Sequence, residues 1–214
     1  MTLSNTFDQI AANLTAWLLA FKGKMGYRPK GRTLTEHLML LLPDSVAVYA
    51  PDPDSQEIGK EHFDLCLTLE DEHHVVYLRA KMSDRHDVAD FFPDWHSVMR
   101  GHKLRHEADD THQSLWTEKK IAENEGKKTV AGGYIIYTPS GVFYAPMGKV
   151  YDLYTSMLKE NQDASPNELS EGISKGIMKD CGSLSSILTD KTDIPKYQRW
   201  ISEEHKKRWN KVSD

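Results

Sequence analysis

A stretch of alternating apolar and polar residues is the feature of this sequence that most constrains its fold. The alternation runs through Phe63, Asp64, Leu65, Cys66, Leu67, Thr68, Leu69 and Glu70. This period of two predicts a strand with one buried face. The acidic residues Glu70 to Glu72 predict a turn, and the segment from His74 to Lys81 is expected to return as the partner strand. Its last three residues are Arg79-Ala80-Lys81, so Arg79 and Lys81 share one face of the sheet.

Helices and a second hairpin surround this pair of strands. Helical spacing of apolar residues predicts helices over 5–22, 33–42, 150–158 and 194–210, one or two exposed helices within 84–125, and a short helix or two within 168–189. Thr33 and Glu36 form a capping-box pattern at the start of the second helix. Residues 46–49 predict a short strand, and Tyr134–Tyr137 and Val142–Ala145 predict a hairpin around the turn Thr138-Pro139-Ser140-Gly141. The expected fold is therefore α+β, or α/β, with a central mixed sheet built from two hairpins and flanked by helices.

Length and composition are those of one globular domain. The 214 residues, of which 39% are hydrophobic, predict a single domain over 1–214. It divides into an N-terminal helix and basic loop (1–32), a core (33–158) and a C-terminal helical region (168–214). No run approaches the roughly 20 apolar residues that a membrane span needs, and no signal-peptide pattern is present. With two cysteines and no Cys-x-x-Cys pair, free thiols and a cytoplasmic location are expected.

Two basic segments allow a second interpretation besides solvent exposure. The connector from Lys22 to Arg32 carries five cations and three glycines, and Arg28, Lys30 and Arg32 are its candidate phosphate contacts. The segment 194–210 interleaves cations with Trp200 and Trp209. It is either a helix that docks its aromatic rings into the domain or an arm that binds nucleic acid or a protein partner.

The order of these elements resembles the core of the PD-(D/E)XK nucleases. The order is a helix with Glu36, a strand, a strand with Asp64, a strand that ends in Arg79-Ala80-Lys81, a helix and a strand. The resemblance covers roughly residues 33 to 145. It implies that Asp64, Glu36 and Lys81 are catalytic, that Asp64 and Glu36 hold Mg²⁺, and that Lys81 positions the water or the scissile phosphate.

Arg79 departs from this pattern, because it stands where the family has its second carboxylate. A cation cannot ligate Mg²⁺ and would repel the ion beside Asp64. The carboxylate could be replaced by Asp84, Asp87 or Asp90 downstream, or the fold could have lost catalysis and kept binding. The resemblance could also be accidental, in which case Arg79 and Lys81 are two cations that pair with Asp64 or with the acidic turn.

Two function classes follow from these residues. The first is a nucleic-acid-processing or nucleic-acid-binding protein of restriction, repair or mobile-element type, with DNA expected more than RNA and Arg79 among the contacts. If active, it is a Mg²⁺-dependent phosphodiester hydrolase. The alternative is a non-catalytic protein-binding regulator, inhibitor or assembly factor, and a homodimer is compatible with both. A weaker hypothesis places zinc on His102 and His106, which would share a helical face.

Overall fold

The computed structural model describes residues 2–26, 31–49, 63–69, 74–82, 103–126, 129–160, 166–192 and 194. Its elements, in chain order, are α1 (Leu3–Met25), α2 (Gly31–Leu41), β1 (Ala47–Tyr49), β2 (Leu65–Thr68), β3 (His74–Met82), α4 (Lys103–Asn124), β4 (Thr129–Thr138), β5 (Gly141–Pro146), α5 (Met147–Glu160), α6 (Pro166–Asp180), β6 (Gly182–Ser183) and the 3₁₀-helix η1 (Leu184–Thr189).

The strands form one sheet in the order β1-β2-β3-β4-β5-β6. Neighbouring strands are antiparallel except β3 and β4, which run parallel from His74 opposite Thr129 to Met82 opposite Tyr137. A parallel pair needs a crossover, and α4 lies between the two strands in the chain. The mixed sheet and both predicted hairpins are confirmed. Within the described residues, the element order α2, β1, β2, β3, α4, β4 is also the order expected from residues 33 to 145.

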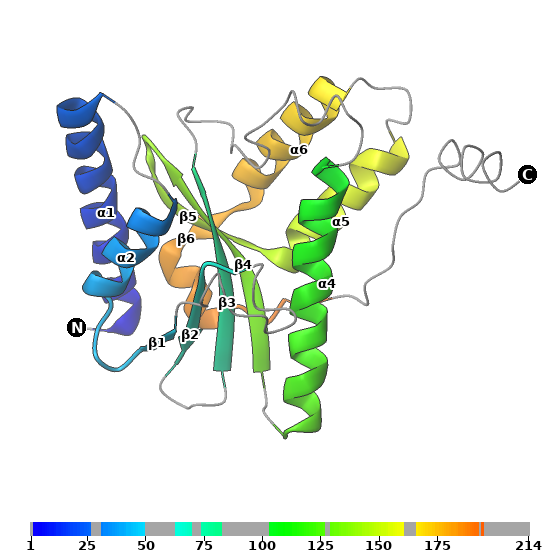
Figure 1. The fold of residues 1–214 in the computed structure, drawn as a ribbon, viewed down its shortest axis with the longest axis horizontal. Helices are drawn as coiled ribbons and strands as arrows, with labels where there is room; N and C mark the ends of the chain where they lie inside the picture. The colour runs from blue at the N-terminus through cyan, green and yellow to red at the C-terminus, as the bar shows by residue number, and fades with distance from the viewer. Residues whose placement is uncertain are drawn as a thin grey trace, which may run out of the picture.

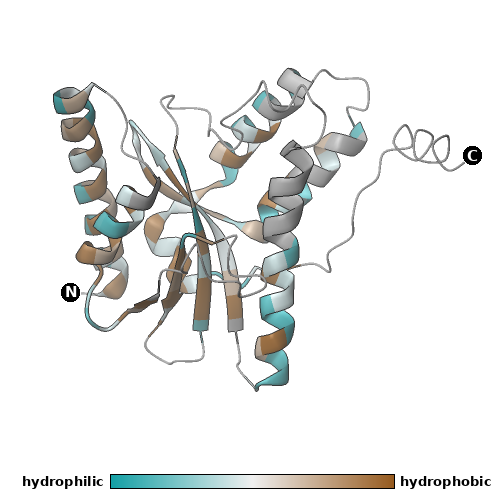
Figure 2. Ribbon diagram, in the orientation of Figure 1, coloured by the Kyte–Doolittle hydropathy of each residue, from teal (hydrophilic) through white to brown (hydrophobic). Residues whose placement is uncertain are grey.

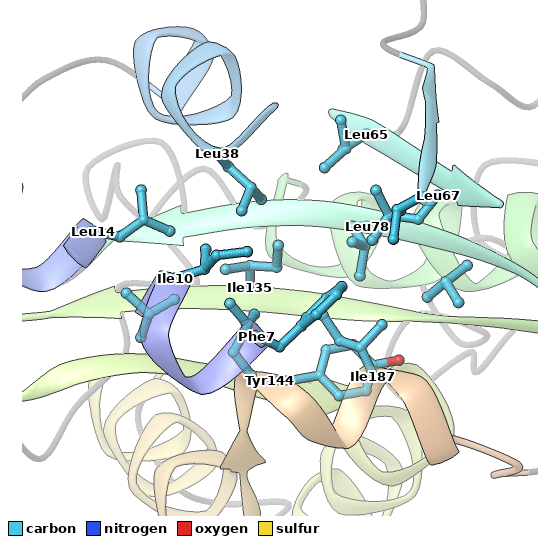
Figure 3. Packing of buried hydrophobic residues seen from close by; sticks show 14 of the residues in the cluster. Phe7, Ile10, Leu14, Leu38, Leu65, Leu67, Leu78, Ile135, Tyr144 and Ile187 are labelled. Atoms are coloured by element: carbon cyan, nitrogen blue, oxygen red, sulfur yellow. The ribbon is translucent and has the colours of Figure 1, made fainter. Parts of the chain in front are cut away.

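Helices cover both faces of the sheet (Figure 1). We call the side of α1, α2 and η1 the first face and the side of α4, α5 and α6 the second face. The first face buries one large apolar cluster that includes Phe7, Ile10, Leu14, Leu38, Leu65, Leu67, Leu78, Ile135, Tyr144 and Ile187 (Figure 3). The second face buries a cluster that includes Leu115, Tyr134, Ile136, Val150, Ile173 and Ile177. Brown and white residues accordingly dominate the central strands, while teal residues recur on the helices (Figure 2).

Alternation along the strands explains why both faces are apolar. In β3, Val76 and Leu78 belong to the first cluster, while Tyr77 between them packs against the second. In β4, Ile135 and Ile136 divide in the same way. A strand buried on both sides reads as a nearly continuous apolar run, as is typical of a strand inside a layered α/β arrangement.

Four details differ from the sequence-based expectation or fall outside the described residues. Helix α2 begins at Gly31, so Thr33 lies within the helix and does not cap it. Strand β4 begins at Thr129, five residues before the predicted Tyr134, and therefore contains Gly132 and Gly133. The turn at 70–72 and the basic segment 195–210 lie outside the described residues.

Gly132 and Gly133 are tolerated in β4 because other parts of the chain come very close to them. A Cβ atom on Gly132 would lie 2.7 Å from a Leu115 methyl of α4 and 2.7 Å from the Tyr77 carbonyl oxygen. A Cβ atom on Gly133 would collide with the Ala145 carbonyl of β5. Glycine inside a strand often marks such a close approach. Separately, within the described ranges no helix combines the length and hydropathy required to cross a bilayer.

Candidate functional site

A bend in the chain just before β2 sets the position of Asp64. The alternation predicted that Phe63 and Leu65 would face the same side. Leu65 does pack in the first cluster, but Phe63 packs in the second, with its ring 5.1 Å from the ring of Tyr77. Two residues that are two apart in a regular strand share a face, so the strand geometry is broken at Asp64. The prediction that Phe63 faces the same side as Leu65 was therefore wrong, because the bend at Asp64 places Phe63 on the opposite face.

The bend brings the Asp64 carboxylate to the backbone of β3, near the end of that strand. The Asp64 backbone N–H donates to the Leu78 carbonyl at 2.9 Å. The Ala80 N–H then donates to Asp64 Oδ2 at 2.7 Å. A carboxylate oxygen thus takes the place of the backbone acceptor that β2 no longer supplies. This bond joins Asp64 to the middle residue of Arg79-Ala80-Lys81. The resemblance expects Asp64 and these three residues to be neighbours.

Arg79 and Lys81 belong to the second face. Lys81 is only 9% exposed, and its ammonium lies 5.9 Å from the centre of the Tyr134 ring, which is part of the second cluster. The strand register places Arg79 opposite Tyr134. A lysine whose stem is buried and whose charge rests near an aromatic face is held in position by cation–π attraction. The two cations therefore stand on one face, close to the carboxylate that holds the backbone between them.

Glu36 lies on a helix of the opposite face. Its helix α2 packs through Leu34 and Leu38 into the first cluster, and the Glu36 side chain is exposed. Lys81, by contrast, contacts the second face. Alternation along β3 separates these two predicted site residues across the sheet, whereas Asp64 and the strand of Lys81 are joined directly.

The other predicted site residues fall mostly outside the described part of the chain. Arg28, Lys30, His102 and the downstream carboxylates Asp84, Asp87 and Asp90 lie outside it. Arg32 lies in the first turn of α2 and His106 lies in α4, but their side chains are not among those described.

The second face also buries a carboxylate that sequence reasoning missed. Glu118 of α4 is 6% exposed, and its Oε2 accepts a hydrogen bond of 2.8 Å from the Tyr77 hydroxyl. Burial, and after it the charge and hydrogen bond of neighbouring groups that include Glu118, raise the pKa of Tyr77 above its ordinary value. Glu118 is three residues after Leu115 and four before Ala122, both buried. This helical spacing was the signal that could have revealed it.

A buried phenol lies near Asp64 on the first face. Tyr137 is 1% exposed, and its hydroxyl has no hydrogen-bond partner in the described part of the chain. Burial, followed by the negative charge of Asp64, raises the pKa of Tyr137. By contrast, the Tyr144 hydroxyl on the same face donates to Asp190 Oδ2 at 2.6 Å.

The described residues do not complete a Mg²⁺ site of the expected kind. Asp64 supplies one carboxylate, and position 79 supplies a guanidinium where a second carboxylate is needed. Among the side chains that are described, no group of three His, Cys, Asp or Glu residues could hold a metal ion. Mg²⁺ prefers oxygen ligands in a near-octahedral arrangement, and the guanidinium of Arg79 offers none.

What this part of the molecule offers is a pair of cations at the end of one strand, held beside a carboxylate that is anchored to the backbone between them. Comparison with known proteins adds no relative: no family model matches the chain, and neither a curated protein nor a solved structure is significantly similar to it.

Proposed function

We propose that this chain binds nucleic acid at the end of β3 through phosphate contacts of Arg79 and Lys81. The observation that carries the proposal is the 2.7 Å bond from the Ala80 N–H to Asp64, which fixes the strand between the two cations. The bond holds the backbone from which both side chains extend. A preorganised cation loses less conformational entropy when it meets a phosphate, so its contact contributes more to affinity.

Arg79 stands where the resemblance expects a carboxylate, and its guanidinium suits this role. A guanidinium presents a planar set of donors that matches two phosphate oxygens, and it stays charged at every physiological pH. The nuclease-like order of elements supports a nucleic acid as the source of that phosphate. The acidic net charge of −5 is compatible with local binding, since Arg79 and Lys81 share one face of β3.

Binding is tested with fluorescently labelled single- and double-stranded DNA and RNA, by anisotropy at increasing salt. Affinity should fall linearly on a log–log plot, with a slope close to the number of phosphates neutralised. Arg79→Gln should weaken binding by about tenfold and reduce the slope by about one. Lys120→Gln is the matched control, because Lys120 is half exposed on α4 and pairs with Glu123 at 2.6 Å.

The same samples, incubated with Mg²⁺ or Mn²⁺, separate binding from cleavage. Cleavage that disappears in both Asp64→Ala and Lys81→Met would replace the binding proposal with the catalytic hypothesis. No salt-dependent binding to any of the four nucleic acids would overturn it. A protein that co-purifies stoichiometrically, together with no nucleic-acid binding, would support the protein-binding regulator instead.

A further inference from the structure

Charge is distributed unevenly along the N-terminal quarter of the chain. Between Asp8 and Glu36 there is no acidic residue, whereas there are five cations, namely Lys22, Lys24, Arg28, Lys30 and Arg32. The whole chain nevertheless has a net charge of −5. Like charges gathered in one segment raise the local potential and attract an anionic partner.

The last two turns of α1 carry the first of these cations away from the core. The fully buried residues of α1 are Phe7, Ile10 and Leu14, none of them beyond its midpoint, although Trp17 and Leu18 also pack against the first cluster. Beyond them, Leu19 is 50% exposed and Met25 is 46% exposed. Lys22 and Lys24 of the last turn are both exposed, and the helix closes at Gly26 with φ 72°. Cations at a helix C-terminus are stabilised by the helix dipole, so the turn holds them at little cost.

A cluster of rings lies on the side of α1 that carries Lys24, since Lys24 follows Trp17 by seven residues, or about two helical turns. Trp17 of α1 stacks on His37 of α2, with ring centroids 4.2 Å apart and an interplanar angle of 20°. Phe21, one turn further along α1, lies 5.3 Å from Trp17. All three side chains are partly exposed. We call these three rings, with Lys24, the α1–α2 surface.

The α1–α2 surface lies at the same end of the molecule as the end of β3. In Figure 1 the last turns of α1 and the turn between β4 and β5 both point to the top. Strand β3 also ends there, because Met82 pairs with Tyr137 just before that turn. A nucleic-acid strand that contacts both sites has to pass over this end of the sheet, because α1 and α2 lie on the first face and Lys81 on the second.

We propose that the α1–α2 surface binds single-stranded nucleic acid, with Lys24 at a phosphate and the ring cluster against unpaired bases. Charge complementarity favours a polyanion, and partly exposed rings beside a cation are what an unpaired strand needs. A duplex hides the faces of its bases, so it can use the cations but not the rings. This inference rests on the proposed nucleic-acid binding and adds a preference for single strands.

The test compares a labelled single strand of about 20 nucleotides with its duplex, by anisotropy at fixed salt. His37→Ala should weaken single-strand binding by about tenfold and leave duplex binding nearly unchanged. His37→Phe keeps a ring and should retain single-strand binding. Lys24→Glu should weaken both forms, whereas Lys120→Glu on α4 should weaken neither. A thermal denaturation curve for each variant shows that it is folded.

Each outcome has a separate meaning. If the wild-type chain binds neither form, the proposed function is overturned and this inference with it. If binding is intact, falls in Arg79→Gln and does not respond to His37→Ala or Lys24→Glu, only the α1–α2 surface is overturned. Equal loss of single-strand and duplex binding in His37→Ala would overturn the contact between rings and bases.

Discussion

The two faces of the sheet are closed by different chemistry, and β3 shows the difference most clearly. Toward the first face it presents Val76 and Leu78, which are fully buried among apolar side chains. Toward the second face it presents Tyr77, Arg79 and Lys81, whose polar atoms need partners. Tyr77 finds Glu118, and Lys81 lies over Tyr134. Along β3, therefore, the first face contributes apolar packing, while the second face holds polar groups in fixed positions.

The largest effect is expected on the first face, from Leu78→Ala. Leu78 is 1% exposed and lies in the middle of the first cluster (Figure 3). Truncation removes buried methyl groups and leaves a cavity, so the free energy of unfolding should fall by about 3 kcal/mol. Urea denaturation measures it. A fall of less than about 1 kcal/mol would show that the first face is not tightly packed.

The two glycines of β4 extend the comparison, because one belongs to each face. Gly133→Ala should cost about 2 to 3 kcal/mol, since the new Cβ meets the Ala145 carbonyl, which belongs to the backbone and cannot rotate away. Gly132→Ala should cost somewhat less, because the Leu115 side chain can partly yield and the backbone contact, 2.7 Å to the Tyr77 carbonyl oxygen, is less severe. Gly23→Ala in α1 is the control, because nothing lies within 4 Å of its Cβ position. That helical substitution should stabilise the chain by about 0.5 to 1 kcal/mol.

Two buried tyrosines on the first face test whether a hydrogen-bond partner determines how much a buried hydroxyl contributes to the free energy of unfolding. Tyr144→Phe removes the 2.6 Å bond to the buried carboxylate of Asp190 and should cost about 1 to 3 kcal/mol. Tyr137→Phe removes a hydroxyl without a described partner and should be neutral or slightly stabilising. Thermal or urea denaturation compares the two variants. Equal destabilisation would mean that Tyr137 has a bond that the described residues do not include.

The smallest effect concerns Tyr77 on the second face and appears at alkaline pH. The folded state raises the pKa of Tyr77 above the ordinary value of 10.0, so folding favours its protonated form. Stability from this group is fully present below about pH 10 and declines as pH rises toward the folded pKa. Tyr77→Phe should lose about 1 kcal/mol at neutral pH, because Glu118 loses its donor, and should make the alkaline decline shallower. Urea denaturation at several pH values checks both effects.

Much of the fold follows from periodicity, because the buried faces of strands and helices leave a local signature. The alternation around Leu65 and Leu67 predicted β2 and its partner, and the Pro139–Gly141 turn predicted the second hairpin. The fate of Phe63 could not be predicted, since a bend is set by the bond between Asp64 and Ala80, sixteen residues away. The prediction that Thr33 caps its helix was also wrong, because the two residues before it are already helical.

The candidate site was predictable in part. Asp64 was expected beside the strand of Arg79 and Lys81, and the structure joins them through Ala80. The separation of Glu36 from Lys81 required knowledge of which face each helix covers, and sequence spacing contains no such information. Glu118 was overlooked because a single acidic residue in a polar helix usually faces water.

The parallel pairing of β3 with β4 has a consequence for how the chain folds. Strands β1 to β3 form one antiparallel ribbon, and strands β4 to β6 form another. Only the parallel pair joins the two ribbons within the sheet, and it must wait until the long segment between Met82 and Thr129 has closed. Loop-closure entropy makes such non-local pairing slow. We therefore expect the β4–β5 hairpin to form early and the β3–β4 pairing to form in the rate-limiting transition state. Substitutions in the β3–β4 pair should then change the folding rate more than substitutions in β1.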